Sequence, residues 1–377
     1  MLSTTLALFG ALSPLIGETP IINPINCANN QDAVPHNIER EVLSVKREVD
    51  RTSTRPKADR FTPHQAPINW YAIGDSYTAG PGAGEDYDSD KKCKRNRGSY
   101  AVQLESDFPF TSTNDLDFVA CSGYVATDTL NKTVPALRQN WADFMVMTLG
   151  GNDIKFSEIA IDCLVRPGLI SRSCDETISI AQKAIAAPKL ENDIHAVYDA
   201  AFAKMKDDRH YQLYHIFYSR FFNAETSWCD TKSFETPLSR NPPLTRAVRK
   251  QLNDLSDQLN ARLEGIVSSY NQLLQSKPSW SSGPRLIGIN PDKIQRSDGS
   301  TYALFDGHRF CEPGATEVEN DNVWIFGTLD DDALQNYSPR EYFDLPEKVS
   351  SSFHPKTAGF RAIKGAVKEA LVKNRAG

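Results

Sequence analysis

The fold is decided by one stretch of sequence, Ile68-Asn69-Trp70-Tyr71-Ala72-Ile73-Gly74-Asp75-Ser76-Tyr77. Its first six residues form a short apolar run, typical of a buried strand in a parallel sheet, and a polar turn follows at once. In open α/β sheets, ligands bind in the crevice beyond the carboxyl ends of the strands. Ser76 therefore stands where such a sheet presents its functional residues.

Further apolar runs along the chain predict a sheet with covering helices. The strand candidates are Ile68–Ile73, Leu116–Ala120, Phe144–Leu149, Leu213–Tyr218 and Arg285–Ile289. Apolar residues at steps of three and four predict a long helix over about 244–274 and a last helix from Thr357. Strands that alternate with crossover helices predict a doubly wound α/β domain. The aromatic run from about Tyr211 to Phe222 is interpreted as a buried strand rather than a substrate platform.

The region before the first strand has a different character. Residues 1–17 contain a short apolar stretch and are interpreted as a secretory signal peptide. Residues 18–65, rich in Arg, Lys and Pro towards their end, are interpreted as a propeptide or mobile N-terminal extension. Residues 66–377 are left as the catalytic domain.

Composition and cysteine spacing exclude several classes of partner. The net charge of −6 gives no broad basic surface, so we expect no nucleic-acid partner. No apolar run beyond the N-terminus is long enough to predict a transmembrane segment. Because no cysteine or histidine cluster has zinc spacing and no dinucleotide-binding loop occurs, we expect neither a metal nor an organic cofactor.

The seven cysteines fit an exported protein. Six lie in the catalytic domain, which permits three disulfides, and Cys27 is the odd one. The sequons at Asn131 and Asn336 agree with a secretory route and with glycosylation. We therefore expect a secreted, extracellular protein.

The residues near the ends of other predicted elements complete a set suited to acyl transfer. Gly123 follows the second strand, Asn152 follows the third, and His354 precedes the C-terminal helix. A serine hydroxyl becomes a good nucleophile when a histidine takes its proton, so we expect Ser76 as nucleophile and His354 as base. The N–H groups of Ser76 and Gly123 and the amide of Asn152 are candidates for an oxyanion hole, in which one donor is typically worth about 2.7–4 kcal/mol.

Four blocks, in the right order, resemble those of the SGNH (GDSL-type) hydrolases: Gly74-Asp75-Ser76-Tyr77-Thr78-Ala79-Gly80, Gly123, Gly150-Gly151-Asn152-Asp153 and His354-Pro355. Finer detail resembles the secreted three-disulfide lipases and esterases of actinomycetes and their fungal relatives, namely Cys93 with Arg97, Ser99 and Tyr100, then Ala120-Cys121-Ser122-Gly123 and Gly307-His308-Arg309-Phe310-Cys311. The resemblance covers about 66–372. It implies a flavodoxin-like, three-layer α/β/α sandwich with a five-stranded, mainly parallel sheet. It also implies the disulfides Cys93–Cys121, Cys163–Cys174 and Cys229–Cys311.

One position departs from the family pattern. The family usually has an aspartate three residues before the histidine, and this chain has Ser351. Some secreted relatives use a main-chain carbonyl to orient the histidine instead. We therefore expect a Ser76–His354 dyad held by the carbonyl of Ser351, with Asp306 as the alternative third member. His308, beside Cys311, competes with His354 for the role of base.

These observations predict a secreted serine esterase or lipase that acts on acyl lipids or short-chain acyl esters. A deacetylase of acetylated polysaccharide would use the same catalytic residues. A third possibility is a binding protein of this fold that catalyses no reaction, but the presence of Ser76, Gly123, Asn152 and His354 argues against it. The G-x-S-x-G elbow of α/β-hydrolases is absent, because residue 78 is threonine. We expect a monomer whose partner is the ester substrate.

Overall fold

The computed structural model describes residues 68–110, 113–165, 172–206, 212–234, 242–276, 285–296, 298–313, 322–327 and 351–375. The signal peptide and the extension expected over 1–65, Cys27 and the sequon at Asn336 lie outside these residues. The description below concerns the unit Ala66–Gly377.

Strands and helices alternate along this unit. The strands are β1 (Ile68–Gly74), β2 (Asn114–Phe118), β3 (Phe144–Thr148), β4 (Gln212–Ile216), β5 (Arg285–Ile289), β6 (Ile294–Gln295) and β7 (Thr301–Tyr302). The α-helices are α2 (Ser76–Ala79), α3 (Tyr100–Ser106), α4 (Ala126–Asp128), α5 (Phe156–Ala160), α6 (Cys174–Ala186), α7 (Pro188–Phe202), α8 (Arg246–Gln275) and α11 (Thr357–Arg375). Short π- and 3₁₀-helical turns are η1 (Thr129–Thr133), η2 (Val134–Ala136) and η3 (Ile161–Val165).

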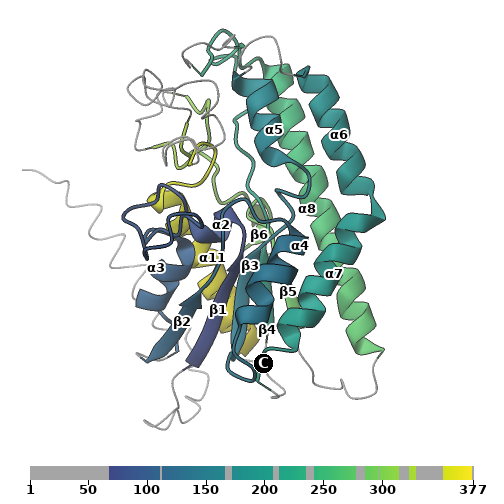
Figure 1. Cartoon of the computed structure of the whole chain (residues 1–377). Coiled ribbons are helices and arrows are strands. Elements are labelled where there is room, and N and C mark those ends of the chain that lie inside the picture. The colour runs from purple at the N-terminus through teal and green to yellow at the C-terminus, as the bar shows by residue number, and fades with distance from the viewer. Residues whose placement is uncertain are drawn as a thin grey trace, which may run out of the picture. The chain divides into compact units, whose positions relative to one another are not determined.

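The main sheet has the strand order β2-β1-β3-β4-β5, and every neighbouring pair is parallel. The helices α3 and α11 cover one face of the sheet, and α4, α7 and α8 cover the other (Figure 1). The structure therefore has the expected three-layer, doubly wound α/β/α architecture of the SGNH fold. The strand order reverses between β1 and β3, which is the switch point where sheets of this kind bind ligands.

The inner strands β1, β3 and β4 are deeply buried. Every residue of β3 is buried, and Trp70 of β1 stacks on Phe144 of β3 with ring centroids 5.1 Å apart. The long helix α8 presents a row of buried leucines to the core: Leu252, Leu255, Leu259 and Leu263. Strands buried on both faces read as continuous apolar runs, which is why the sequence predicts them.

Two strands differ most from the prediction: β2 is displaced along the chain, and β4 ends at Ile216 and not at Tyr218. β2 begins and ends two residues earlier than Leu116–Ala120, because the polar residues at its start belong to the strand. The side chain of Asn114 accepts a hydrogen bond from Trp70 Nε1 at 3.0 Å, and Asp115 is exposed at the edge of the sheet. An edge strand tolerates such residues, so an apolar run alone misplaces its ends.

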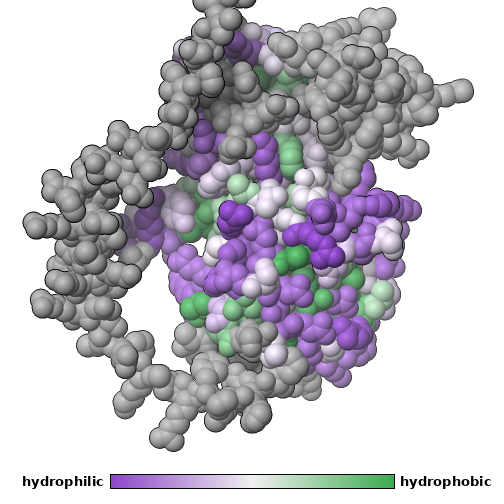
Figure 2. Space-filling model, turned by 90° about the vertical axis from the view of Figure 1, so that its left-hand side faces the viewer, coloured by the Kyte–Doolittle hydropathy of each residue, from purple (hydrophilic) through white to green (hydrophobic). Residues whose placement is uncertain are grey.

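The described surface is mainly polar. On the face drawn in Figure 2, outside the grey atoms, hydrophilic residues predominate and hydrophobic residues form small separate patches. Among the described residues, the helices are too short or too polar to cross a membrane. The large apolar side chains are instead gathered in the core of the unit.

Candidate active site

Ser76 lies at the carboxyl end of β1, at the first position of α2. The preceding turn needs glycine at position 74, because its φ is +106° and a Cβ there would lie 2.1 Å from the carbonyl oxygen of Thr148. Asp75 caps α2 by accepting a hydrogen bond from Tyr77 N–H at 3.0 Å. The turn between strand and helix therefore fixes the Ser76 backbone at the rim of the sheet.

His354 meets this serine from the other end of the chain. Its Nε2 lies 2.7 Å from Ser76 Oγ. Two backbone hydrogen bonds from Phe326 hold the loop that carries His354. The carbonyl of Phe326 accepts from Phe353 N–H at 2.8 Å, and the N–H of Phe326 donates to the carbonyl of His354 at 2.9 Å. The hydroxyl of Tyr77 also donates to the carbonyl of Phe353 at 2.9 Å. These hydrogen bonds hold the loop that carries His354 against the turn that carries Ser76.

The group that orients the imidazole differs from the expectation. His354 Nδ1 lies 3.0 Å from the carbonyl oxygen of Ser352, not from that of Ser351. The carbonyl of Ser351 accepts from the backbone N–H of His354 at 2.9 Å. The reason is local: Phe353 adopts a left-handed conformation with φ of 62°, which turns the chain between Ser352 and His354. The carbonyl beside Nδ1 therefore belongs to Ser352, one residue after the predicted Ser351.

Asp306 and His308 lie away from the Ser76–His354 pair. The side chain of Asp306 is 70% exposed and accepts a hydrogen bond from Arg309 at 2.5 Å, which disfavours it as a third member. His308 stacks on Trp324 with ring centroids 3.5 Å apart, and its Nδ1 contacts the carbonyl of Asn322 at 2.8 Å. These contacts favour a structural role for His308.

The surroundings favour a neutral imidazole at His354. Its pKa is lowered to about 4, chiefly by burial and to a smaller extent by the Lys94 cation, against the opposing effect of the carbonyl of Ser352 and of Ser351. A neutral imidazole that donates from Nδ1 has a free lone pair on Nε2. That lone pair is what a base needs in order to take the proton of Ser76.

The expected oxyanion donors follow β1 and the two strands that flank it: Ser76 follows β1, Gly123 follows β2 and Asn152 follows β3. Cys121 N–H donates to the carbonyl of Gly74 at 2.9 Å, which ties the Gly123 loop to the serine turn. Among the described residues, the N–H groups of Ser76 and Gly123 have no acceptor. The side-chain amide of Asn152 donates one hydrogen bond to the carbonyl of Tyr124 at 3.0 Å. Its second N–H remains available to donate to a substrate. Three donors are thus available at this rim.

Three disulfides brace the loops of the unit. They are Cys93–Cys121, Cys163–Cys174 and Cys229–Cys311, with S–S distances of 2.02, 2.05 and 2.08 Å. The first joins the segment after α2 to the loop that carries Gly123. Within the described residues, no group of three histidine, cysteine, aspartate or glutamate side chains could hold a metal ion.

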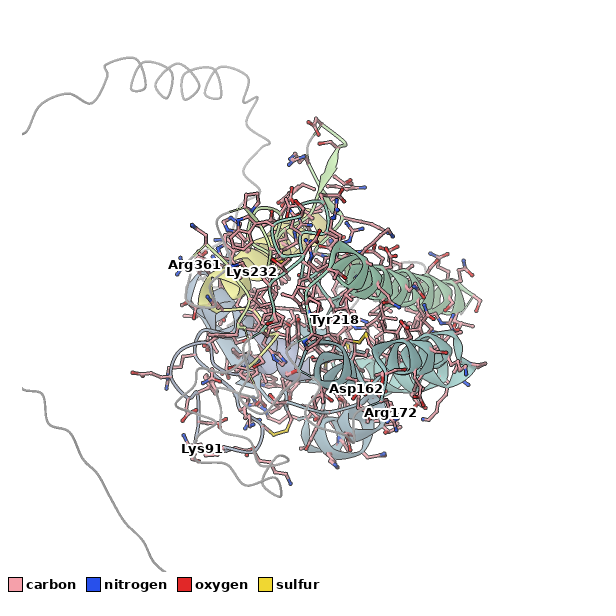
Figure 3. All side chains as sticks on the ribbon, turned by 90° about the horizontal axis from the view of Figure 1, so that it is seen from above. Lys91, Asp162, Arg172, Tyr218, Lys232 and Arg361 are labelled. Carbon is pink, nitrogen blue, oxygen red and sulfur yellow. A yellow bond between two sulfur atoms is a disulfide. The ribbon has the colours of Figure 1, made fainter. Side chains whose placement is uncertain are left out.

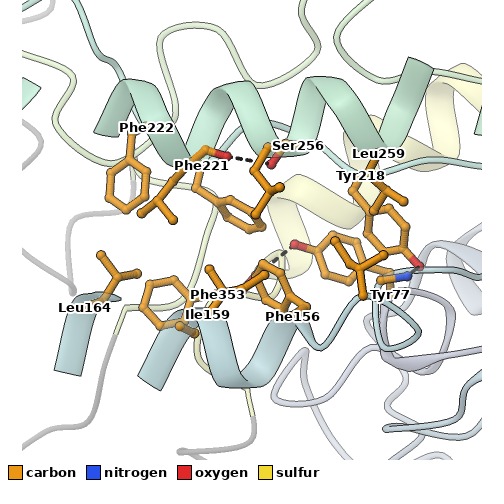
Figure 4. Close-up of a pocket in the computed structure, with 15 residues that line it drawn as sticks. Tyr77, Phe156, Ile159, Leu164, Tyr218, Phe221, Phe222, Ser256, Leu259 and Phe353 are labelled. Atoms are coloured by element: carbon orange, nitrogen blue, oxygen red, sulfur yellow. Dashed lines mark hydrogen bonds between the residues drawn. The ribbon is translucent and has the colours of Figure 1, made fainter. Parts of the chain in front are cut away.

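An apolar cavity of about 560 Å³, counting its open mouth, lies beside these loops. Figure 4 shows it between α5 with η3 on one side and α8 on the other. It is lined by Tyr77, Gly151, Ile154, Phe156, Ile159, Ala160, Leu164, Tyr218, Phe221, Phe222, Leu252, Leu255, Ser256, Leu259 and Phe353. Three of these residues are the immediate chain neighbours of Ser76, Asn152 and His354. The cavity therefore adjoins the candidate active site.

The sequence analysis missed the residues that build this cavity. β4 ends at Ile216, and the aromatic run continues beyond it as a loop whose Phe221 and Phe222 line the cavity. The interpretation of Tyr211–Phe222 as one buried strand is therefore wrong for its second half. Alternating burial could not reveal the difference, because all of the side chains from Leu213 to Tyr218 are buried.

Comparison with known proteins defines the class. A serine hydroxyl in contact with a histidine nitrogen at the switch point of a parallel sheet is the arrangement of a serine hydrolase. The chain belongs to the GDSL-like lipase/acylhydrolase family, whose model matches residues 72–284.

Individual relatives come from actinomycetes. The chain is 32% identical to a lipase of Streptomyces rimosus over 132 residues, which are 35% of this chain and 46% of that protein. It therefore spans about half the length of that relative. It is 27% identical to lipase 1 of Streptomyces coelicolor over 222 residues, which are 59% of this chain and 74% of that protein.

Two solved structures share the fold. The extracellular lipase of Streptomyces rimosus has a TM-score of 0.55 and 22% identity, over 80% of this chain and 99% of that chain. Phospholipase A1 of Streptomyces albidoflavus NA297 has a TM-score of 0.56 and 20% identity, over 81% of this chain and 99% of that chain. At these identities the likeness concerns the fold alone.

Proposed function

We propose that the chain is a serine esterase or lipase that hydrolyses carboxylic esters through an acyl-enzyme on Ser76. The observation that carries the proposal is the 2.7 Å contact between Ser76 Oγ and His354 Nε2. A serine held at hydrogen-bond distance from a neutral imidazole is an activated nucleophile. Membership of a family of lipases and acylhydrolases supports the same reaction.

The proposed reaction has two halves. In the first, His354 takes the proton of Ser76 as Oγ attacks the ester carbonyl, and the charge on the carbonyl oxygen is stabilised by Ser76 N–H, Gly123 N–H and the Asn152 amide. The imidazolium then gives its proton to the alcohol oxygen as the ester bond breaks. In the second half, His354 takes a proton from water, water attacks the acyl-enzyme, and the acid leaves as Ser76 recovers its proton.

The apolar cavity supports an acyl chain as the group bound beside the serine. Its lining offers aromatic and aliphatic side chains from Phe156 and Ile159 on one wall and from Leu255 and Leu259 on the other. Each buried methylene of a linear chain is worth about 0.8 kcal/mol, so a cavity of this kind favours substrates longer than acetate.

A panel of p-nitrophenyl esters from two to sixteen carbons tests this proposal. We expect kcat/KM to rise with chain length until the cavity is full, and then to level off or fall. The variant Ala160→Phe places a ring in the cavity, so it should move the optimum to shorter chains while leaving acetate hydrolysis within about twofold. A panel with no chain-length preference, or an unchanged optimum in Ala160→Phe, would argue against the cavity as the acyl site.

A second candidate function is deacetylation of acetylated polysaccharide. The catalytic groups would be the same, and only the bound group would differ. Acetylated xylan beside the ester panel separates the two functions. Faster release of acetate from xylan than from any acyl ester of the panel would favour the polysaccharide.

The dependence of rate on pH tests the proposed dyad. Only the neutral imidazole can take the serine proton, and burial lowers the pKa of His354 to about 4. The acidic limb of kcat/KM should therefore fall well below pH 6.5, the ordinary value of histidine. A limb near pH 6 would point instead to a buried carboxyl group, since burial raises the pKa of Asp75 and of Asp153 to about 6. Each sample should be returned to neutral pH and assayed again, so that denaturation is separated from titration.

Two variants accompany the pH profile. Ser351→Ala and Asp306→Asn should each keep kcat/KM within about tenfold of wild type, because His354 Nδ1 lies beside the carbonyl of Ser352 and the Asp306 side chain is bonded to Arg309. A triad aspartate changed to asparagine typically costs about 10⁴-fold. A loss of that size in folded Asp306→Asn would replace the dyad by a triad that includes Asp306.

We also propose that the protein is exported and acts outside the cell as a monomer. The three disulfides support export, because disulfides persist in oxidising compartments. Asn131 is exposed, which is compatible with glycosylation at that sequon. Analysis of the culture medium and light scattering of the purified protein test these two points.

A further inference from the structure

One buried tyrosine joins the two loops that carry the proposed nucleophile and the amide donor. Tyr218 follows β4 and is 6% exposed. Its hydroxyl donates to Asp75 Oδ2 at 2.5 Å and accepts from the backbone N–H of Gly151 at 2.9 Å. Seen from above, Tyr218 lies in the interior of the unit, whereas Lys91 and Arg172 lie at its margin (Figure 3). A single oxygen atom therefore bridges the loops after β1 and β3.

The first loop is held through Asp75, the residue before Ser76. Its second carboxyl oxygen accepts from Thr148 Oγ1 at 2.5 Å and from Tyr77 N–H at 3.0 Å, and its own N–H donates to the carbonyl of Thr148 at 3.0 Å. The carboxylate is therefore bonded from three sides. Any shift of this side chain moves the backbone of Ser76 with it.

The second loop, which follows β3, packs closely against the ring of Tyr218. A Cβ at Gly151 would lie 2.9 Å from Tyr218 Cζ and 3.1 Å from the hydroxyl, so only glycine allows the loop to approach this closely. The next residue, Asn152, is held on its other side by the carbonyl of Tyr124 at 3.0 Å. The position of the Asn152 amide thus depends on the Gly151 bond to Tyr218.

The tyrosine is itself anchored to α8. Asn260 Oδ1 accepts from Tyr218 N–H at 3.1 Å, and Asn260 Nδ2 donates to the carbonyl of Tyr218 at 2.6 Å. Burial raises the pKa of Tyr218 well above its ordinary value, so the hydroxyl keeps its proton and the directions of its two bonds are fixed. A protonated hydroxyl on an immobile ring can therefore keep the distance between the two loops fixed.

We propose that Tyr218 is a positioning residue for ester hydrolysis, which sets the separation between Ser76 and the Asn152 amide. The inference rests on the proposed function. A tyrosine that only filled the core would need one partner for its hydroxyl, whereas this hydroxyl joins the two loops whose spacing decides the transition-state geometry. Misplacement of such groups by a fraction of an ångström lowers the rate without changing ground-state binding.

Tyr218→Phe tests the inference, because it removes the bridging oxygen and keeps the ring that packs on Gly151. We expect kcat to fall about 10- to 100-fold while KM stays within about twofold. The matched control is Tyr270→Phe, which also removes a hydroxyl that donates to an aspartate, Asp199 Oδ1 at 2.7 Å, between α8 and α7. The control should lose stability and keep its kcat.

A double-variant cycle with Asn152→Ala separates positioning from a merely structural role. If Tyr218 acts through the Asn152 loop, the double variant should be no more than about threefold slower than Asn152→Ala alone. Fully additive losses, or an unchanged kcat in folded Tyr218→Phe, would overturn the inference. If Tyr218→Phe does not fold, Asn260→Ala loosens the same tyrosine and enters the same cycle with the same two outcomes.

Failure of the inference and failure of the proposed function give different results. If the proposed function fails, Ser76→Ala keeps its activity or the wild type does not hydrolyse the esters of the panel. If only the inference fails, hydrolysis depends on Ser76 and is indifferent to the hydroxyl of Tyr218.

Discussion

Ser76→Ala is expected to lower kcat for ester hydrolysis by a factor on the order of 10⁶, because the loss of a serine nucleophile removes the acyl-enzyme route. The fold should survive, since the lost hydroxyl is bonded to His354 at 2.7 Å and to no other described side chain. The measurement is kcat of the purified variant on the best ester of the panel. Thermal unfolding of the same sample shows whether the fold is intact.

Ser122→Ala is the matched control for this prediction. Its hydroxyl is buried near Gly123 and has no hydrogen-bond partner among the described residues, so its loss should change kcat by less than about threefold. Residual activity above about 1% in folded Ser76→Ala would reject Ser76 as nucleophile. A serine-directed phosphonate should label the wild type and Ser122→Ala, and should fail to label Ser76→Ala.

The central strands and the serine turn could be predicted because their physics is local. β3 and most of β1 are buried and read as apolar runs, which in β1 only the partly exposed Asn69 interrupts, and the positive φ at Gly74 favours glycine. The edge strand β2 was misplaced by two residues, because Asn114 joins the sheet through Trp70, which is distant in sequence. Local patterns predict what local sterics and burial decide.

The group that orients the His354 imidazole could be predicted from the sequence only as a class of group, a main-chain carbonyl. The departure at Ser351 pointed to a main-chain carbonyl, yet which carbonyl contacts Nδ1 depends on the left-handed turn at Phe353. No sequence pattern predicts that a phenylalanine adopts this left-handed conformation. It is stabilised by long-range bonds to Phe326 and Tyr77, which only the folded chain brings together.

The cavity and Tyr218 could not be predicted from the sequence at all. The cavity wall combines α5, η3, α8 and the segment after β4, so no single stretch of sequence describes it. Tyr218 sits in an aromatic run that is typical of a core strand, and its role rests on hydrogen bonds to residues 143 and 67 positions away. Motifs identify the groups that react, and tertiary structure identifies the groups that hold them.

Asn152→Ala is expected to lower kcat about 10²- to 10³-fold, the usual cost of one oxyanion donor, with little change in KM. The reason is that the carbonyl oxygen gains its full charge only in the transition state, where the second amide hydrogen of Asn152 becomes a charge-assisted donor. Asn152→Asp should be slower still, because a carboxylate offers no donor and repels the developing charge. Stopped-flow measurement of acylation with a p-nitrophenyl ester isolates the affected step.

Asn271→Ala is the matched control, because that amide also donates to a backbone carbonyl, Leu286 O at 2.8 Å, but at the start of β5 and so at the opposite edge of the sheet. Asn271 Oδ1 also accepts from Leu286 N–H at 3.2 Å, so the variant should lose about 1–3 kcal/mol of stability and keep its kcat, since both hydrogen bonds serve only the fold. If Asn152→Ala behaves like this control, with a lower unfolding temperature and an unchanged acylation rate, the amide holds the Tyr124 loop and does not stabilise the oxyanion. The N–H groups of Ser76 and Gly123 would then stabilise the charge alone, and the coupling between Tyr218 and Asn152 would vanish with the role of the amide.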